Sequence, residues 1–132
     1  MSNTQFRFDH FACEGDTCTV ERNGYVVTAT LVADTISTPT DCDCYSEEQI
    51  KAWRRDEWCF VGVVMSATYN GVSLGSHLAS LWGVEANFPD SDNSYIGEVA
   101  EEMMPEVLAE AEKARHALIA QLTAEVAEEV AS

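Results

Sequence analysis

The sequence predicts an α+β domain with an antiparallel sheet, and three observations support this class. Two Asn-Gly pairs, at 23–24 and 70–71, each separate two strand-like segments, and this dipeptide is typical of two-residue β-hairpin turns. A helical repeat of apolar residues fills the last third of the chain. The 132 residues, 46% of them hydrophobic, are enough for one domain with its own core. We therefore treat residues 1–132 as a single domain.

The first hairpin joins a segment over 17–22 to one over 25–32. A two-residue loop pairs Arg22 with Tyr25, and side chains alternate between the two faces of a strand. One face then holds Cys18, Val20, Tyr25, Val27, Ala29 and Leu31. The residues before this hairpin, 5–12, are compatible with a further strand, so strands are expected over about 5–33.

A polar connector leads from the first hairpin to a short helix, predicted over about 46–57. Ser46 followed by Gln49 three residues later is the capping-box pattern that starts a helix. The second hairpin is predicted over about 58–85. Ideal pairing across its turn puts eight residues on one face: Val61, Val63, Met65, Ala67, Val72, Leu74, Leu78 and Trp82.

The C-terminal segment, about 94–131, is predicted to be one long helical region with an apolar stripe. The stripe consists of Ile96, Val99, Met103, Val107, Ala111, Ala114, Leu118, Leu122 and Val126. Pro105 lies inside this pattern, and an internal proline removes a helix hydrogen bond and clashes with the preceding turn. We therefore expect a kink or a break at Met104, with Pro105 as the first residue of a second helical segment.

The charge is the most informative property of the composition. The chain has 23 acidic and 7 basic residues, a net charge of −16, which exceeds the magnitude of about 2–8 that solubility requires of a small domain. Such a chain repels nucleic acid and anionic membranes and attracts basic partners. No apolar run approaches the roughly 20 residues of a membrane span, and the N-terminus lacks the pattern of a signal peptide. A cytoplasmic location is expected.

Catalytic and metal-binding patterns are weak in this sequence. Without an export signal, the five cysteines predict reduced thiols. Cys13, Cys18, Cys42 and Cys44 are numerous enough to bind zinc, but their spacing is not that of a zinc knuckle. The three histidines share no motif, and no phosphate-binding or hydrolase motif is present. We therefore expect no enzyme activity, no cofactor and no metal.

A row of glutamates on the C-terminal helix is the main candidate for a binding site. Glu98, Glu102, Glu106 and Glu110 recur every four residues, so they share one side of the helix, and Glu101 and Glu112 flank them. Neighbouring carboxylates at this spacing repel each other by about 0.2–0.5 kcal/mol per pair. Two explanations remain open. The row is either a solvated surface whose first members complement the helix dipole, or a display of charge that imitates DNA phosphates, joined by Asp41, Asp43, Glu47 and Glu48 from the connector.

A resemblance adds a biological setting. The segment 81–95, which reads LWGVEANFPDSDNSY, and the following EVAEE and PEVLAEA resemble small proteins of bacteriophages and mobile elements. In general character the chain is similar to anti-CRISPR and anti-restriction proteins, many of which are small, acidic and occupy a DNA-binding surface. The resemblance assigns no site residue.

These observations lead to one hypothesis and one alternative. The hypothesis is a non-enzymatic inhibitor, encoded by a phage or mobile element, that binds a basic, nucleic-acid-handling host complex in the bacterial cytoplasm. It would bind neither nucleic acid nor membranes directly. The alternative is a structural or assembly protein that forms a homodimer through its C-terminal helix.

Overall fold

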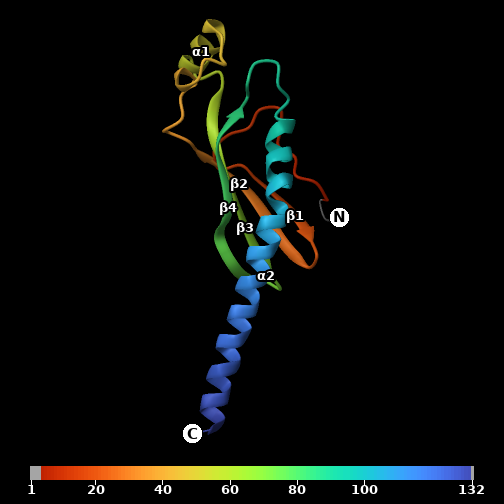
Figure 1. Cartoon of the computed structure of the whole chain (residues 1–132). Coiled ribbons are helices and arrows are strands. Elements are labelled where there is room, and N and C mark those ends of the chain that lie inside the picture. Colours follow the sequence, from red (N-terminus) through yellow and green to blue (C-terminus); the bar gives the residue numbers. More distant parts are fainter. Residues whose placement is uncertain (1–3, 132) are drawn as a thin grey trace.

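The computed structural model describes the backbone of residues 4–131 and the side chains up to residue 124. It confirms the α+β class (Figure 1), with four antiparallel strands in the order β1-β2-β3-β4. The elements are β1 (Thr17–Arg22), β2 (Tyr25–Ala33), the 3-10 turn η1 (Pro39–Asp41), α1 (Glu47–Arg54), β3 (Cys59–Tyr69), β4 (Val72–Ala86) and α2 (Ser94–Ala131).

The main core lies between one face of the sheet and the first half of α2, which runs across that face (Figure 1). The sheet contributes alternate residues of β2 and β3, since every second side chain of a strand points to the same face. Members of this core that are less than 2% exposed include Val27, Ala29, Val63, Met65, Ile96, Val99 and Val107. The first part of the predicted stripe is confirmed, because Ile96, Val99, Val107 and Ala111 are buried in this core and Met103 and Ala114 pack against it. The later part is not buried: Leu118 is half-buried and Leu122 is 53% exposed, while Val126 lies outside the described side chains.

The first hairpin has the predicted register, with Arg22 opposite Tyr25 and Val20 opposite Val27. Its turn residues have positive φ angles, 55° at Asn23 and 85° at Gly24. A type I′ turn requires positive φ at both central positions, and asparagine and glycine adopt it at the lowest cost. Local sequence therefore specifies this half of the sheet.

The second hairpin departs from ideal pairing because β4 contains irregularities. The register shifts in three places along the β3–β4 pair, and Gly75 and Gly83 in β4 have positive φ angles of 146° and 72°. The prediction that Trp82 shares the inner face is therefore wrong. Trp82 is 46% exposed, and its ring lies over Gly62, where an added Cβ would be 2.3 Å from the ring.

The expected strand over residues 5–12 does not form. This segment has no strand assignment and passes beside the start of α2, where Phe6 is 6% exposed. Its backbone groups bond to side chains instead of to a neighbouring strand. The side chain of Asn87 both accepts from Ala12 N and donates to Ala12 O, each at 2.8 Å. The apolar alternation that suggested a strand instead packs the segment into the core.

The second helical segment expected from Pro105 does not exist, because α2 is continuous from Ser94 to Ala131. Pro105 lies on the exposed side of the helix, where water can reach the carbonyl that loses its backbone partner. Figure 1 shows the ribbon bending gently without a break and then continuing past the sheet.

Helix α1 is shorter than predicted but starts where expected. Ser46 is its N-cap, and Ser46 and Gln49 exchange the two capping-box hydrogen bonds. Behind α1 lies a second, aromatic cluster, in which Trp58 is 1% exposed and donates its indole N–H to the Gln49 carbonyl at 2.8 Å. Tyr45 also belongs to it; burial and a hydrogen bond to the Glu85 carboxylate raise the pKa of Tyr45 to about 12.

Asp34 connects the end of β2 to the irregular part of β4. Its carboxylate accepts hydrogen bonds from the Ser37 hydroxyl at 2.7 Å, Gly83 N at 2.8 Å, and Ile36 N and Ser37 N at 3.0 Å. Partial burial acts to raise the pKa of Asp34, but these hydrogen bonds outweigh it and hold the pKa below the usual 3.8.

This network predicts a pH-dependent loss of stability. The folded pKa of Asp34 is depressed, so its contribution is present above pH 3.8 and is lost as the pH falls through the folded value. Asp34→Asn should lower the free energy of unfolding by roughly 1–2 kcal/mol at neutral pH. The difference from the parent should shrink below pH 3.8 in urea titrations. The control is Asp90→Asn at an exposed position, which should leave the free energy of unfolding unchanged at neutral pH and below pH 3.8. If Asp34→Asn lost the same free energy of unfolding under both conditions, the hydrogen bonds of Asp34 would not cause the pH dependence.

Candidate functional site

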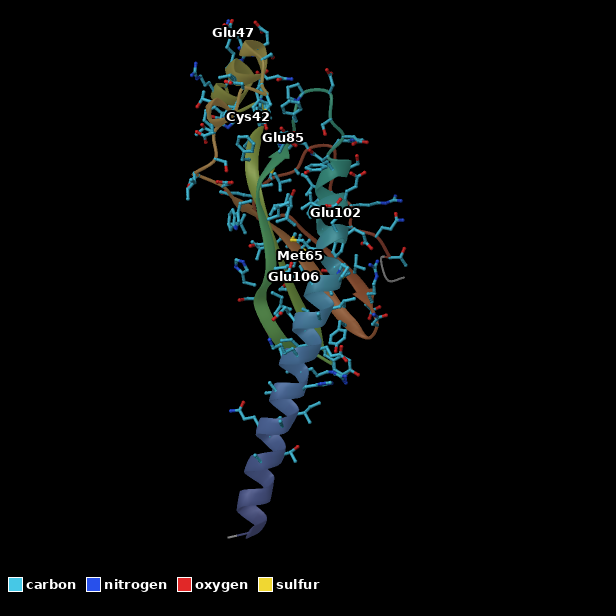
Figure 2. The ribbon with its side chains drawn as sticks, viewed as in Figure 1. Cys42, Glu47, Met65, Glu85, Glu102 and Glu106 are labelled. Atoms are coloured by element: carbon cyan, nitrogen blue, oxygen red, sulfur yellow. A yellow bond between two sulfur atoms is a disulfide. The ribbon has the colours of Figure 1, made fainter. Side chains whose placement is uncertain are left out.

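The ten acidic residues predicted to bind a partner form two separate groups. Glu47 lies at the far end of the molecule on α1, whereas Glu102 and Glu106 lie along α2 (Figure 2). All ten residues are exposed. The structure therefore does not join the connector and the helix row into one continuous surface.

The connector group has structural roles that account for most of its members. Asp41 accepts a hydrogen bond from Thr38 N at 3.2 Å at the start of η1. Glu47 and Glu48 occupy the first turn of α1, where negative charge stabilises the helix dipole. Asp43 has no such role. The connector acids are thus weaker candidates for partner binding than the glutamates of α2.

The helix row consists of Glu98, Glu102, Glu106 and Glu110, and we call it the α2 acidic row. Within residues 4–124, none of the four takes part in an ion pair. The flanking Glu101 differs, because it pairs with Arg22 of β1. That ion pair anchors the edge strand to the helix and removes Glu101 from the charge available to a partner.

The helix dipole does not account for the α2 acidic row. The first turn of α2 contains no acidic residue, and the dipole effect fades within one turn. Asp92, just before the helix, instead places a negative charge at the N-terminus of α2, where its carboxylate accepts a hydrogen bond from Ser94 N at 2.9 Å. Hydrogen bonds from the side chain and backbone of Ser94 lower the pKa of Asp92. Because no new helix begins at Pro105, Glu106 and Glu110 are not near a helix start either.

The α2 acidic row carries its charges at a wider spacing than a DNA strand. Successive members of the row are four residues apart, and at a rise of about 1.5 Å per residue this places one carboxylate every ~6 Å along the helix. Glu112 lies two residues from Glu110, so it faces a different side of the helix and does not raise this density. One strand of duplex DNA carries a charge every ~3.4 Å.

A shallow cavity of about 780 Å³ adjoins the start of the row. It lies between the N-terminal segment and α2, and both Glu98 and Glu101 line it. Arg7, His10 and Arg22 line it as well, so its charge is mixed. The row continues past this cavity with Glu102, Glu106 and Glu110, which do not line it.

The cysteines are arranged differently from the expectation. Cys42 and Cys44 form a disulfide, with Cα atoms 5.4 Å apart, a separation that a disulfide can bridge. The prediction of reduced thiols is therefore wrong for this pair, and cysteine usage no longer supports a reducing compartment. Cys18 is buried as predicted, while Cys13 and Cys59 are free and exposed. Among the residues that the structure describes, no three metal-ligating side chains lie close enough together to hold a metal ion.

Sequence reasoning missed a pair of asparagines that holds the N-terminal segment in place. Asn93 is 1% exposed and donates to Asp9 O, His10 O and Asn87 Oδ1, each at 2.9 Å. Both asparagines have positive φ, 66° at Asn93 and 62° at Asn87. The available signal was two asparagines in a turn-rich segment, since asparagine tolerates this backbone conformation.

The fold defines the class of this protein as α+β, and comparisons with known proteins add no narrower class. No protein-family model, curated protein sequence or solved structure matches this chain. In the described part of the chain, no helix combines the length and the apolar character that a membrane span requires.

Proposed function

We propose that this protein is a non-enzymatic inhibitor, encoded by a bacteriophage or mobile element, that binds a basic, nucleic-acid-handling host complex. The α2 acidic row would take the place of DNA phosphates on that complex, in the cytoplasm of the host bacterium. The phage-like segment and the net charge of −16 support the setting. One observation carries the proposal: four exposed glutamates repel each other along a helix where, among the described side chains, neither the helix dipole nor an ion pair offsets the cost.

The proposal assigns different weights to the ten predicted residues. Glu102, Glu106 and Glu110 contribute most, because they lie beyond the mixed charges of the cavity. Glu98 extends the surface at its start, whereas Glu112, which lines a pocket together with Arg115, contributes less. The connector acids make at most a secondary contact, since the structure separates them from α2 (Figure 2).

Electrostatic binding of this kind has a characteristic dependence on salt. Long-range attraction accelerates association, and counter-ions screen it over about 8 Å at physiological ionic strength. Captured host proteins should therefore elute from the immobilised protein at moderate salt. A short DNA duplex should compete with the protein for the same complex.

Neutralising the row tests the site. The variant Glu98→Gln, Glu102→Gln, Glu106→Gln, Glu110→Gln changes the net charge from −16 to −12 and should abolish capture of a DNA-competed complex from bacterial lysates. Glutamine forms helices as readily as glutamate, so the fold should persist, which circular dichroism checks.

A matched variant separates the row from total charge. Glu14→Gln, Glu21→Gln, Asp56→Asn, Asp90→Asn changes four exposed acids outside the predicted site. It has the same net charge of −12 but leaves α2 and the connector intact, so it should retain capture at unchanged salt. Equal losses in the two variants would show that only net charge attracts the complex. That result would refute a mimicry surface on α2.

A further inference from the structure

The Cys42–Cys44 disulfide lies at the surface of the connector, at the same end of the molecule as α1 (Figure 2). Both cysteines are exposed, and the bond joins residues only two positions apart in the sequence. A disulfide stabilises a protein mainly by restricting the unfolded chain, and the effect grows with the length of the loop that the bond closes. A loop this short gains very little, so stabilisation of the fold does not account for the bond.

The residues on both sides hold the disulfide segment in position. Before it, Asp41 accepts a hydrogen bond from Thr38 N at 3.2 Å, and Pro39 of the same 3-10 turn is buried. After it, the Tyr45 ring packs in the aromatic cluster, with its centroid 5.4 Å from the centroid of the Trp58 ring. The two cysteines are therefore presented to solvent from a segment that is anchored at both ends.

A backbone hydrogen bond makes the two sulfurs inequivalent. Cys44 N donates to Cys42 Sγ at 3.3 Å. A hydrogen bond to the charged form of a group stabilises that form, so this N–H favours a thiolate on Cys42. In thiol–disulfide exchange, the sulfur whose thiolate is more stable leaves faster. An incoming thiolate is therefore expected to attack Cys44 Sγ, with Cys42 as the leaving group.

Negative charge surrounds the disulfide. Asp43 lies between the two cysteines, and Asp41 and Glu47 are close to them in the sequence. None of these three carboxylates forms an ion pair with the described side chains, whereas Glu48 Oε1 lies 3.9 Å from Lys51 Nζ. The unpaired charges attract a cationic thiol and repel an anionic one, over a range of about 8 Å at physiological ionic strength. The site therefore favours thiols with positive charge nearby.

We propose that Cys42–Cys44 is a redox-active disulfide that exchanges with thiols on positively charged molecules, such as a cysteine flanked by lysine or arginine. The substrate thiolate attacks Cys44 Sγ, the S–S bond of the protein breaks, and Cys42 leaves as a thiolate that takes up a proton from water. A second substrate thiolate then attacks the substrate sulfur of this mixed disulfide and releases Cys44. Two substrate thiols thereby lose two electrons and two protons to become one disulfide, and the protein gains them as two thiols.

This exchange does not depend on the proposed inhibitory function. It takes place at the connector, which the structure separates from the α2 acidic row (Figure 2), and it gives the connector acids a role of their own in selecting the thiol. Its test uses small thiols and the pure protein with no partner present, so failure of one proposal leaves the other standing.

Opening of the disulfide by small thiols of opposite charge tests the selectivity. The full chain carries Cys13→Ser and Cys59→Ser, because these two exposed cysteines are free and would also react. Cysteamine and mercaptopropionate are compared at equal thiolate concentration, and mass spectrometry follows the mixed disulfide. Cysteamine should react several-fold faster at low salt, and its advantage should shrink in about 1 M salt, where the Debye length falls to about 3 Å. Equal rates at low salt would overturn the proposal.

Two charge-matched variants locate the source of the selectivity. Asp43→Asn, Glu47→Gln should lower the ratio of the cysteamine rate to the mercaptopropionate rate several-fold. The control Glu106→Gln, Glu110→Gln has the same net charge of −14 but changes α2, away from Cys42 (Figure 2), and should keep the ratio of the parent. An equal decrease in the two variants would assign the selectivity to total charge and not to the connector.

Peptide mapping tests the direction of attack. After a brief reaction with cysteamine, iodoacetamide alkylates the thiol that has been released. Cysteamine should be found mainly on Cys44 and the alkyl group mainly on Cys42, because the Cys44 N–H stabilises the Cys42 thiolate. The reverse distribution would contradict the assigned leaving group.

Reduction of the bond tests its structural role. The fully reduced protein should unfold at nearly the same urea concentration as the oxidised protein, because the bond closes so short a loop. A large decrease of the urea midpoint on reduction would make the bond a structural staple. That result, or a disulfide that cysteamine does not open, would overturn the proposal.

Discussion

Replacing Asn93 with alanine is expected to lower the free energy of unfolding by about 2–4 kcal/mol. The substitution removes the three hydrogen bonds that the Asn93 amide donates to Asp9 O, His10 O and Asn87 Oδ1, and also the one that its side-chain oxygen accepts from Asn87 N. Buried polar groups that lose their partner cost about 1–3 kcal/mol. The backbone φ of 66° adds a further cost for alanine. Urea titration followed by tryptophan fluorescence measures the loss.

Glycine at the same position separates the two causes. Asn93→Gly removes the same hydrogen bonds but adopts positive φ freely, so it should recover the backbone part of the loss. Hydrogen exchange should also accelerate at the Ala12 amide, whose acceptor Asn87 Oδ1 is held by Asn93. If Asn93→Ala unfolded at the same urea concentration as the parent, the asparagine pair would not anchor the N-terminal segment.

Local sequence predicted those parts of the fold that short-range rules govern. Asn23-Gly24 set the turn and register of the first hairpin, and Ser46 with Gln49 set the start of α1. Both features depend on interactions between residues a few positions apart, so the local sequence is enough to predict them. The sheet-facing stripe of α2 was predictable for the same reason.

The errors occurred where distant contacts decide the structure. Residues 5–12 alternate like a strand, but the side chains of Asn87 and Asn93, some eighty positions away, take their backbone hydrogen bonds. The bulges of β4 depend on positive φ at Gly75 and Gly83, and one shift is enough to move Trp82 to the other face. Glycines inside a strand often mark a bulge, so β4 carried a local signal, whereas nothing near residues 5–12 in the sequence indicates their contacts with Asn87 and Asn93.

The candidate site was predictable in composition but not in arrangement. The four-residue spacing fixed which glutamates share a side of α2, and a continuous helix keeps them together. The sequence did not indicate that Arg22 neutralises Glu101, because that contact joins residues 79 positions apart. The sequence-based prediction also combined the connector acids with the α2 acidic row, although α1 lies at a different end of the molecule (Figure 1).

Replacing Gly97 with alanine should destabilise the protein, although glycine-to-alanine changes inside helices usually gain about 1 kcal/mol. A Cβ at position 97 would lie 2.4 Å from the carbonyl oxygen of Phe6. The clash is with backbone, and Phe6 is itself anchored in the core with 6% exposure, so neither group can move cheaply. We expect a net loss of about 1–3 kcal/mol, as for other overpacked sites, measured as a lower urea midpoint.

The sign of this effect should reverse when the obstructing segment is removed. In a chain lacking residues 1–8, Phe6 is absent, and Gly97→Ala should raise the urea midpoint because only the helix preference of alanine remains. This comparison distinguishes close packing of the N-terminal segment from any intrinsic need for glycine, whose φ here does not lie in the left-handed range. A loss of stability in both chains would mean that the segment does not pack on α2 as described. A gain in both would lead to the same conclusion, and the cavity between the segment and the start of the α2 acidic row would then lose one wall.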